Sequence, residues 1–172
     1  VVLEGESYAR AEIAGSTLTI NRAKPTIQLT GEVKDSMLTV TAQVTGPTTG
    51  DVELSINGET VTVPAVDGIA MYTTADSGLV SLYEVTAKYV ETPLYETAES
   101  LPIQIEVHVT GVALNESNFN LTIDETATLQ AIVRPLNATN PAVVWHSDNE
   151  AVATVTQDGI VTALSTGTAL IT

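Results

Sequence analysis

The chain has 172 residues and a formal net charge of −15, because 21 acidic side chains stand against only 6 Lys and Arg. It is 44% hydrophobic but only 4% aromatic, and it contains no Cys. This composition excludes disulfides, thiolate metal sites and Cys nucleophiles, and it argues against nucleic acid and anionic membrane surfaces as partners, since both require cationic side chains.

The sequence shows no apolar run near the roughly 20 residues that a membrane-spanning helix needs, and no signal peptide. We therefore expect no membrane insertion within this segment. Because the chain starts at Val1 and stops inside the alternating stretch TALIT, we interpret it as a segment of a longer polypeptide.

The first residues resemble a later part of the same chain. LEGESYARAE at 3–12 and VETPLYETAE at 90–99 share an aliphatic residue, a Glu, a Tyr and a final Ala-Glu at matching positions. We predict residues 1–23 to be the last strand and preceding loop of an upstream repeat. RAKPT at 22–26 would be the joint, where Pro25 helps to stop one strand from running into the next.

Residues 24–108 alternate between apolar and polar side chains with the period of a β-strand, and no segment shows the apolar spacing of a helix. Asn57-Gly58 lies between two alternating runs and predicts a tight hairpin, because both turn residues must take positive φ. One strand is expected to place Leu38, Val40, Ala42 and Val44 on one face, and a later strand Tyr83, Val85, Ala87 and Tyr89. Turn-rich segments separate seven predicted strands, the complement of one immunoglobulin-like sandwich, near 26–33, 37–45, 51–57, 60–65, 69–74, 81–90 and 101–108.

Residues 109–172 carry motifs of a known family. VALN (112–115), ATLQAIVRP (127–135), VVWHSDNEAVATV (143–155) and DGIVTAL (158–164) resemble the group 2 bacterial immunoglobulin-like domain, found in intimin- and invasin-type adhesins, other surface proteins and phage structural proteins. The family usually has Gly-Glu-Thr where this chain has Asp124-Glu125-Thr126, which leaves the geometry of that turn open. Its final strand usually continues past Thr172, so the match is truncated at its C-terminal end.

Residues 24–108 are similar to a further bacterial immunoglobulin-like group, through the TGDVELSING hairpin and a Tyr-containing loop before the final strand. Together these features predict an all-β fold of tandem immunoglobulin-like β-sandwiches with essentially no helix. The expected division is 1–23 as the end of a preceding repeat, 24–108 as one sandwich and 109–172 as a group 2 domain.

His146, Ser147 and Asp148 are the residue types of a hydrolytic triad and stand next to one another. Successive residues of a strand point to opposite faces, whereas a triad needs these groups to converge from separate parts of a fold beside an oxyanion hole. We therefore interpret the segment as a strand in which Trp145 faces the core together with Val143. No catalytic residue is assigned.

Metal binding is a weaker hypothesis. His108 lies at the predicted junction, where a zinc ion would need further His or Cys ligands that the chain does not offer. Acidic residues near joints and loops could hold Ca²⁺ between domains, but none has the ligand spacing of an EF-hand, so solvated surface charge is the preferred interpretation. These residues are Glu91, Glu96, Glu99, Glu106, Asp124, Glu125, Asp148, Glu150 and Asp158. No cofactor-binding or metal residue is assigned.

We expect a non-enzymatic, extracellular segment of a bacterial surface or adhesin-type protein that serves as a spacer and an adhesion module. Its expected partners are neighbouring immunoglobulin-like modules of the same chain and a host-surface protein or carbohydrate. One alternative is a phage decoration, tail or fibre protein. Another is an accessory module of a secreted carbohydrate-active enzyme, against which the scarcity of exposed aromatic side chains argues.

Overall fold

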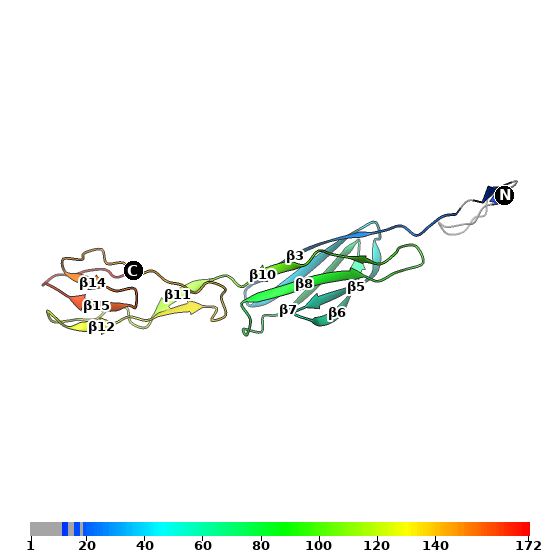
Figure 1. Ribbon diagram of the computed structural model, residues 1–172. Helices are drawn as coiled ribbons and strands as arrows, with labels where there is room; N and C mark the ends of the chain where they lie inside the picture. Colours follow the sequence, from blue (N-terminus) through cyan, green and yellow to red (C-terminus); the bar gives the residue numbers. More distant parts are fainter. Residues whose placement is uncertain (1–11, 14–15, 18) are drawn as a thin grey trace. The chain divides into compact units, whose positions relative to one another are not determined.

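The computed structural model describes residues 12–13, 16–17 and 19–172, with side chains from residue 19 onward. Every regular element in this described part is a β-strand and none is a helix, which confirms the predicted all-β class (Figure 1). The chain divides into two compact units, Val1–Glu106 and Val107–Thr172. Much of the expected preceding repeat, residues 1–23, lies outside the described residues; within it β1 (Glu12–Ile13) pairs antiparallel with β2 (Ser16–Thr17).

The first unit contains all seven strands that the sequence predicts between residues 24 and 108. They are β3 (Thr26–Lys34), β4 (Met37–Thr45), β5 (Thr49–Ile56), β6 (Glu59–Val66), β7 (Ile69–Ala75), β8 (Leu82–Tyr89) and β10 (Ile103–Glu106). A short strand that was not predicted, β9 (Ala98–Glu99), pairs with β8. The strand order is β10-β8-β5-β6-β7-β4-β3, with neighbours antiparallel.

This continuous order folds into two layers because one of its links is very short. β6 and β7 are paired only through Val66 and Ile69, at the turn that joins them. By contrast β5 and β6 pair along their whole length, from Thr49–Val66 to Ile56–Glu59. The strands β10, β8, β5 and β6 therefore form one layer, and β7, β4 and β3 form the other, as in an immunoglobulin-like sandwich.

Alternation along the strands builds the core between these layers. The faces predicted for β4 and β8 are the buried ones: Leu38, Val40, Ala42 and Val44 are at most 2% exposed, and Tyr83, Val85, Ala87 and Tyr89 at most 6%. The two layers also meet closely along one side of the sandwich, because a Cβ on Gly31 of β3 would lie only 2.3 Å from Ile105 Cδ1 of β10. The opposite side, between β6 and β7, is open beyond its turn.

The tight hairpins have residue types suited to left-handed backbone. Asn57 (φ 49°) and Gly58 (φ 85°) form the predicted turn between β5 and β6. Asp67 (φ 52°) and Gly68 (φ 78°) join β6 to β7 with the same sign of φ at both positions. Positive φ at both central residues matches the twist of the flanking strands, so each turn holds its strand pair in register.

The second unit is built from shorter strands. β11 (Gly111–Leu114) pairs with β13 (Ala131–Arg134), and β15 (Ile160–Ala163) lies between β12 (Thr126–Thr128) and β14 (Ala153–Val155). Leu129, Trp145 and Val161 form its core, with partly buried apolar side chains around them. This unit therefore has a hydrophobic core of its own.

Candidate functional site

The segment from Trp145 to Asp148 has a structural role rather than a catalytic one. His146 is exposed, whereas Ser147 is only 3% exposed, so the two side chains leave the backbone on opposite sides as expected. The Ser147 hydroxyl donates to the Ala153 carbonyl oxygen at 2.7 Å. Asp148 Oδ1 accepts the Leu170 N–H at 2.6 Å. Both side chains stabilise local backbone, and they do not converge on the imidazole.

Trp145 lies in the core as predicted, with Val143 packed against the same cluster. The segment is extended and pairs on one edge with the last residues of the described chain, through the isolated bridge between Ser147 and Ile171 and reciprocal backbone hydrogen bonds between His146 and Thr172 at 2.7 and 2.8 Å, so the predicted strand is a short one. On the opposite edge, the side chain of Gln157 bonds the backbone of Trp145. Its Oε1 accepts the Trp145 N–H at 3.2 Å and its Nε2 donates to the Trp145 carbonyl at 3.1 Å, and so it takes the place of a neighbouring strand.

The turn at Asp124 keeps the geometry that a Gly would adopt. Asp124 has φ 68°, and the Glu125 N–H donates to the Thr122 carbonyl at 3.0 Å across the turn. Asp is among the few non-Gly residues that tolerate this conformation. The Glu125 carboxylate accepts the Thr122 backbone N–H at 2.7 Å. This bond is the larger cause of the lowered pKa of Glu125, and a hydrogen bond from the Thr122 hydroxyl is the smaller one.

The acidic residues proposed for Ca²⁺ are dispersed. Within residues 19–172, no three His, Asp or Glu side chains come together as a metal site would require. Glu91 forms an ion pair with Arg22 at 2.8 Å, in the loop that follows β8. His108 is exposed near the start of the second unit. Three of these acids have described contacts: Glu91 in this ion pair, and Glu125 and Asp148 as acceptors of backbone N–H groups.

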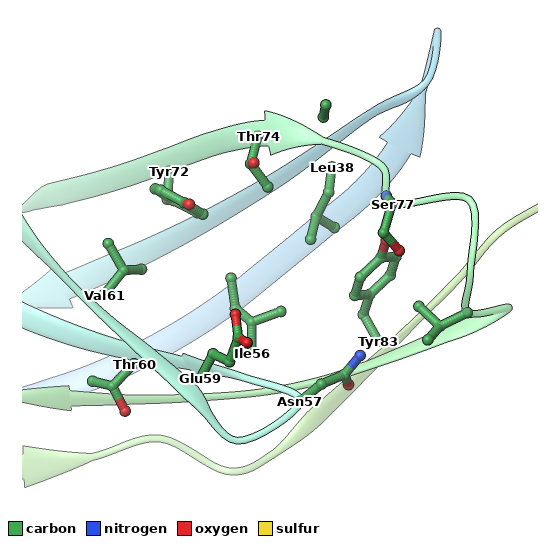
Figure 2. A pocket seen from close by; sticks show the side chains of 12 residues that line it. Leu38, Ile56, Asn57, Glu59, Thr60, Val61, Tyr72, Thr74, Ser77 and Tyr83 are labelled. Atoms are coloured by element: carbon green, nitrogen blue, oxygen red, sulfur yellow. Dashed lines mark hydrogen bonds between the residues drawn. The ribbon is translucent and has the colours of Figure 1, made fainter.

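A hollow of about 450 Å³ opens in the first unit where β6 and β7 separate, and the sequence did not predict it (Figure 2). Tyr72 and Thr74 of β7 line one wall and Val61 of β6 another, and buried Leu38 and Tyr83 contribute from β4 and β8. Polar groups from β6 and from neighbouring turns and loops also line it: Asn57, Glu59, Thr60 and Ser77. It is open to solvent and has both apolar and polar walls.

Hydrogen bonds to the Tyr83 hydroxyl hold the loop between β7 and β8 in place beside this hollow. The Tyr83 hydroxyl donates to Asp76 Oδ1, and the Ser77 N–H donates to the Tyr83 hydroxyl oxygen at 3.3 Å. The Ser77 hydroxyl lies 3.4 Å from the same oxygen. No His or Lys is among the residues that line the hollow, so Ser77 has no basic side chain there to activate it as a nucleophile.

The two-layered, all-antiparallel strand order of the first unit defines an immunoglobulin-like fold. More specifically, residues 108–172 match the family model of the bacterial Ig-like domain (group 2), which confirms the resemblance seen in the sequence. Such a domain is a bacterial surface-type module.

The chain is also similar to an uncharacterized protein of Clostridium acetobutylicum, with 41% identity over 66 residues. The match covers 38% of this chain and 7% of that relative, so the matched segment is a small part of the larger protein. No helix among the described residues is long and apolar enough to cross a membrane.

Proposed function

We propose that this chain is a non-enzymatic, extracellular spacer segment of a bacterial surface protein, which sets a distal binding or catalytic module away from the cell. The group 2 match of residues 108–172 supports the bacterial surface context. The path of the chain through the first unit supports the spacer role.

That path is the observation that carries the proposal. Six antiparallel steps separate β3 from β10 in the strand order, so the first and last strands of the sandwich run in the same direction. The chain therefore enters this unit at one end and leaves it at the other. At about 3.3 Å per residue, the 9 residues of β3 alone advance the chain by about 30 Å.

Small-angle X-ray scattering on the full chain tests the spacer role. We expect a pair-distance distribution with a long tail, typical of an extended particle, and a radius of gyration above that of a globular protein of equal mass, which is about 16 Å for this length. A symmetric distribution with the radius of a compact globule would contradict the proposal. Antibody labelling of intact cells of the producing bacterium tests the location separately, and a signal seen only after lysis would contradict it.

A further inference from the structure

We propose that the open edge of β7 is a docking site for an extended peptide that carries Lys or Arg near its ends, bound by β-strand addition with one apolar side chain in the adjoining hollow. The proposal begins with hydrogen-bonding directions along the strands. Two-residue hairpins close on a hydrogen-bonded pair, and alternate residues then face the same neighbour. Because β6 and β7 close on Val66 and Ile69, the backbone groups of Met71, Thr73 and Ala75 face away from β4.

These backbone groups have no strand beside them. Among the described residues, β7 is paired with β4 along its length on one side, but on the other side only Ile69 has a strand partner. The edge beyond Ile69 thus presents N–H and C=O groups in the alternating row that an incoming strand requires.

The facing edge of β6 differs, because it is blocked. Thr60, Thr62 and Pro64 belong to its outward row by the same geometry, and Pro64 lacks an N–H. Proteins protect exposed edges with Pro and charged residues. β6 carries Pro64 and Glu59, whereas β7 from Ile69 to Ala75 has neither a Pro nor a charge. Of the two edges, only β7 is left suited to pairing.

The hollow supplies a place for a side chain of the added strand. Tyr72 and Thr74 point inward from β7, and Figure 2 shows Val61 of β6 on the other side of the hollow, while Leu38 of β4 is the strand neighbour of Thr74. A residue directly opposite Tyr72 in the added strand would point the same way, because side chains of paired residues lie on one face. A Leu-sized side chain is suited to the apolar part of this wall.

Charge at the two ends of β7 selects the partner. Asp67 precedes the strand and Asp76 follows it, and the Asp76 N–H donates to the Ser36 carbonyl at 2.9 Å, next to Asp35. From Asp35 to Ala87 the sequence contains seven acids and no Lys or Arg. Strands β3, β4 and β7 contain a single Lys or Arg, Lys34 of β3, which pairs with Met37 of β4 and so lies two strands from β7. A second copy of so acidic a chain would be repelled, whereas basic groups flanking a short neutral strand would be attracted.

The test uses the full chain and a short synthetic peptide of alternating Thr and Val, with a central Leu and a Lys at each end. Amide hydrogen exchange is followed by NMR with and without the peptide. We expect exchange at Met71, Thr73 and Ala75 to slow by about tenfold or more at saturation, with Thr60 and Thr62 unchanged. Unchanged exchange along β7, or slowing at β6 instead, would overturn the proposal.

A matched pair of variants separates strand addition from general effects. Thr73→Pro removes an outward N–H of β7, and Thr62→Pro does the same on the blocked edge of β6; an edge strand tolerates Pro where the N–H faces solvent. Binding of the fluorescent peptide, measured by anisotropy, should weaken at least about tenfold in the first variant and stay near the original value in the second. Equal loss in both would overturn the assignment to β7.

Changes in the peptide provide the remaining controls, and they do not depend on whether a variant folds. Replacing its Lys residues by Glu, or methylating the backbone nitrogens that face β7, should abolish binding, whereas methylating the other row should not. If the Glu peptide binds as well as the Lys peptide, the charge argument is wrong. If sedimentation shows that the chain alone self-associates and that Thr73→Pro prevents this, a second copy is the occupant and the peptide proposal fails.

Discussion

Individual residues in this protein are constrained most strongly where left-handed backbone coincides with close packing. Gly159 has φ 78°, and a Cβ there would lie 2.3 Å from the Leu129 carbonyl oxygen and 3.4 Å from Trp145. Gly78 has a similar φ of 68° but open space around it. The two glycines therefore separate the backbone effect from the packing effect.

We predict that Gly159→Ala lowers the free energy of unfolding of the second unit by about 2 kcal/mol or more, because the left-handed conformation costs about 1–2 kcal/mol for an L-residue and the Leu129 backbone must also move. Gly78→Ala should cost only the conformational part in its own unit. Urea denaturation of each variant measures both values. Equal losses in the two variants would show that packing around Gly159 contributes nothing.

Glu125 gives a pH-dependent prediction. Its pKa is lowered in the folded state by the Thr122 backbone N–H, so the unfolded chain binds this proton more readily. The stabilisation from this bond is complete above the unfolded-state pKa and is lost as the pH falls through the lower, folded-state pKa. In an NMR titration, we expect the Glu125 carboxyl to titrate at lower pH than solvated Glu side chains. Thr122→Pro, which removes both the N–H and the hydroxyl that lower this pKa, should return it to their range, and an unchanged titration in that variant would contradict the assigned causes.

At the scale of elements, the β5–β6 turn also fastens a third strand. The Asn57 side-chain Oδ1 accepts the Glu84 N–H of β8 at 2.8 Å, and the Asn57 N–H donates to the Glu84 carbonyl at 2.9 Å. Asn57 therefore combines tolerance of positive φ with an acceptor that joins the turn to β8.

We predict that Asn57→Ala costs about 1.5–3.5 kcal/mol, the sum of a left-handed penalty of about 1–2 kcal/mol and about 0.5–1.5 kcal/mol for a lost hydrogen bond to an exposed amide. Asn57→Asp should cost less, because Asp tolerates the conformation and retains the acceptor. Thermal unfolding of the two variants provides the measurement. A similar loss in both variants would mean that the side-chain nitrogen of Asn57, rather than its side-chain oxygen, provides the stabilisation.

The sequence predicted these elements well because a period of two leaves few choices. The inward faces of β4 and β8 follow directly from alternation, and Asn57-Gly58 identifies its hairpin through the conformation that it needs. β9 was missed because Ala98–Glu99 lies in a turn-rich stretch. It pairs with β8 beside a bond from the Ala87 N–H to the Ser100 hydroxyl oxygen, a tertiary contact with no local signal.

The hollow could not be predicted for a related reason. VDG at 66–68 indicates a turn, and hence that β6 and β7 are neighbours, but not that they part after one residue pair. The parting depends on how the two layers pack over Leu38 and Tyr83. The two hydrogen bonds between the Gln157 side chain and the Trp145 backbone could not be predicted either, because a side chain that takes the place of a neighbouring strand leaves no periodic pattern in the sequence.

For the whole molecule, each unit is stabilised by its own core, and one spectroscopic signal reports on the second unit alone. The chain has one Trp, Trp145, which lies in the core of the second unit. Gly31, at the close approach of β3 to β10, belongs to the first unit. Tryptophan fluorescence thus follows the second unit alone, whereas far-UV circular dichroism follows both.

We predict that Gly31→Val, which forces extra volume against Ile105 and the Thr39 carbonyl, destabilises the first unit by about 1–3 kcal/mol and leaves the fluorescence midpoint unchanged. Gly159→Ala should have the opposite effect, with a lower fluorescence midpoint and an unchanged first-unit transition by circular dichroism. This reciprocal result is what a spacer of separately folded units requires, because damage to one unit then leaves its neighbour intact. If either substitution moved both midpoints together, the two units would form one cooperative structure, and the spacer mechanism would lose its physical basis.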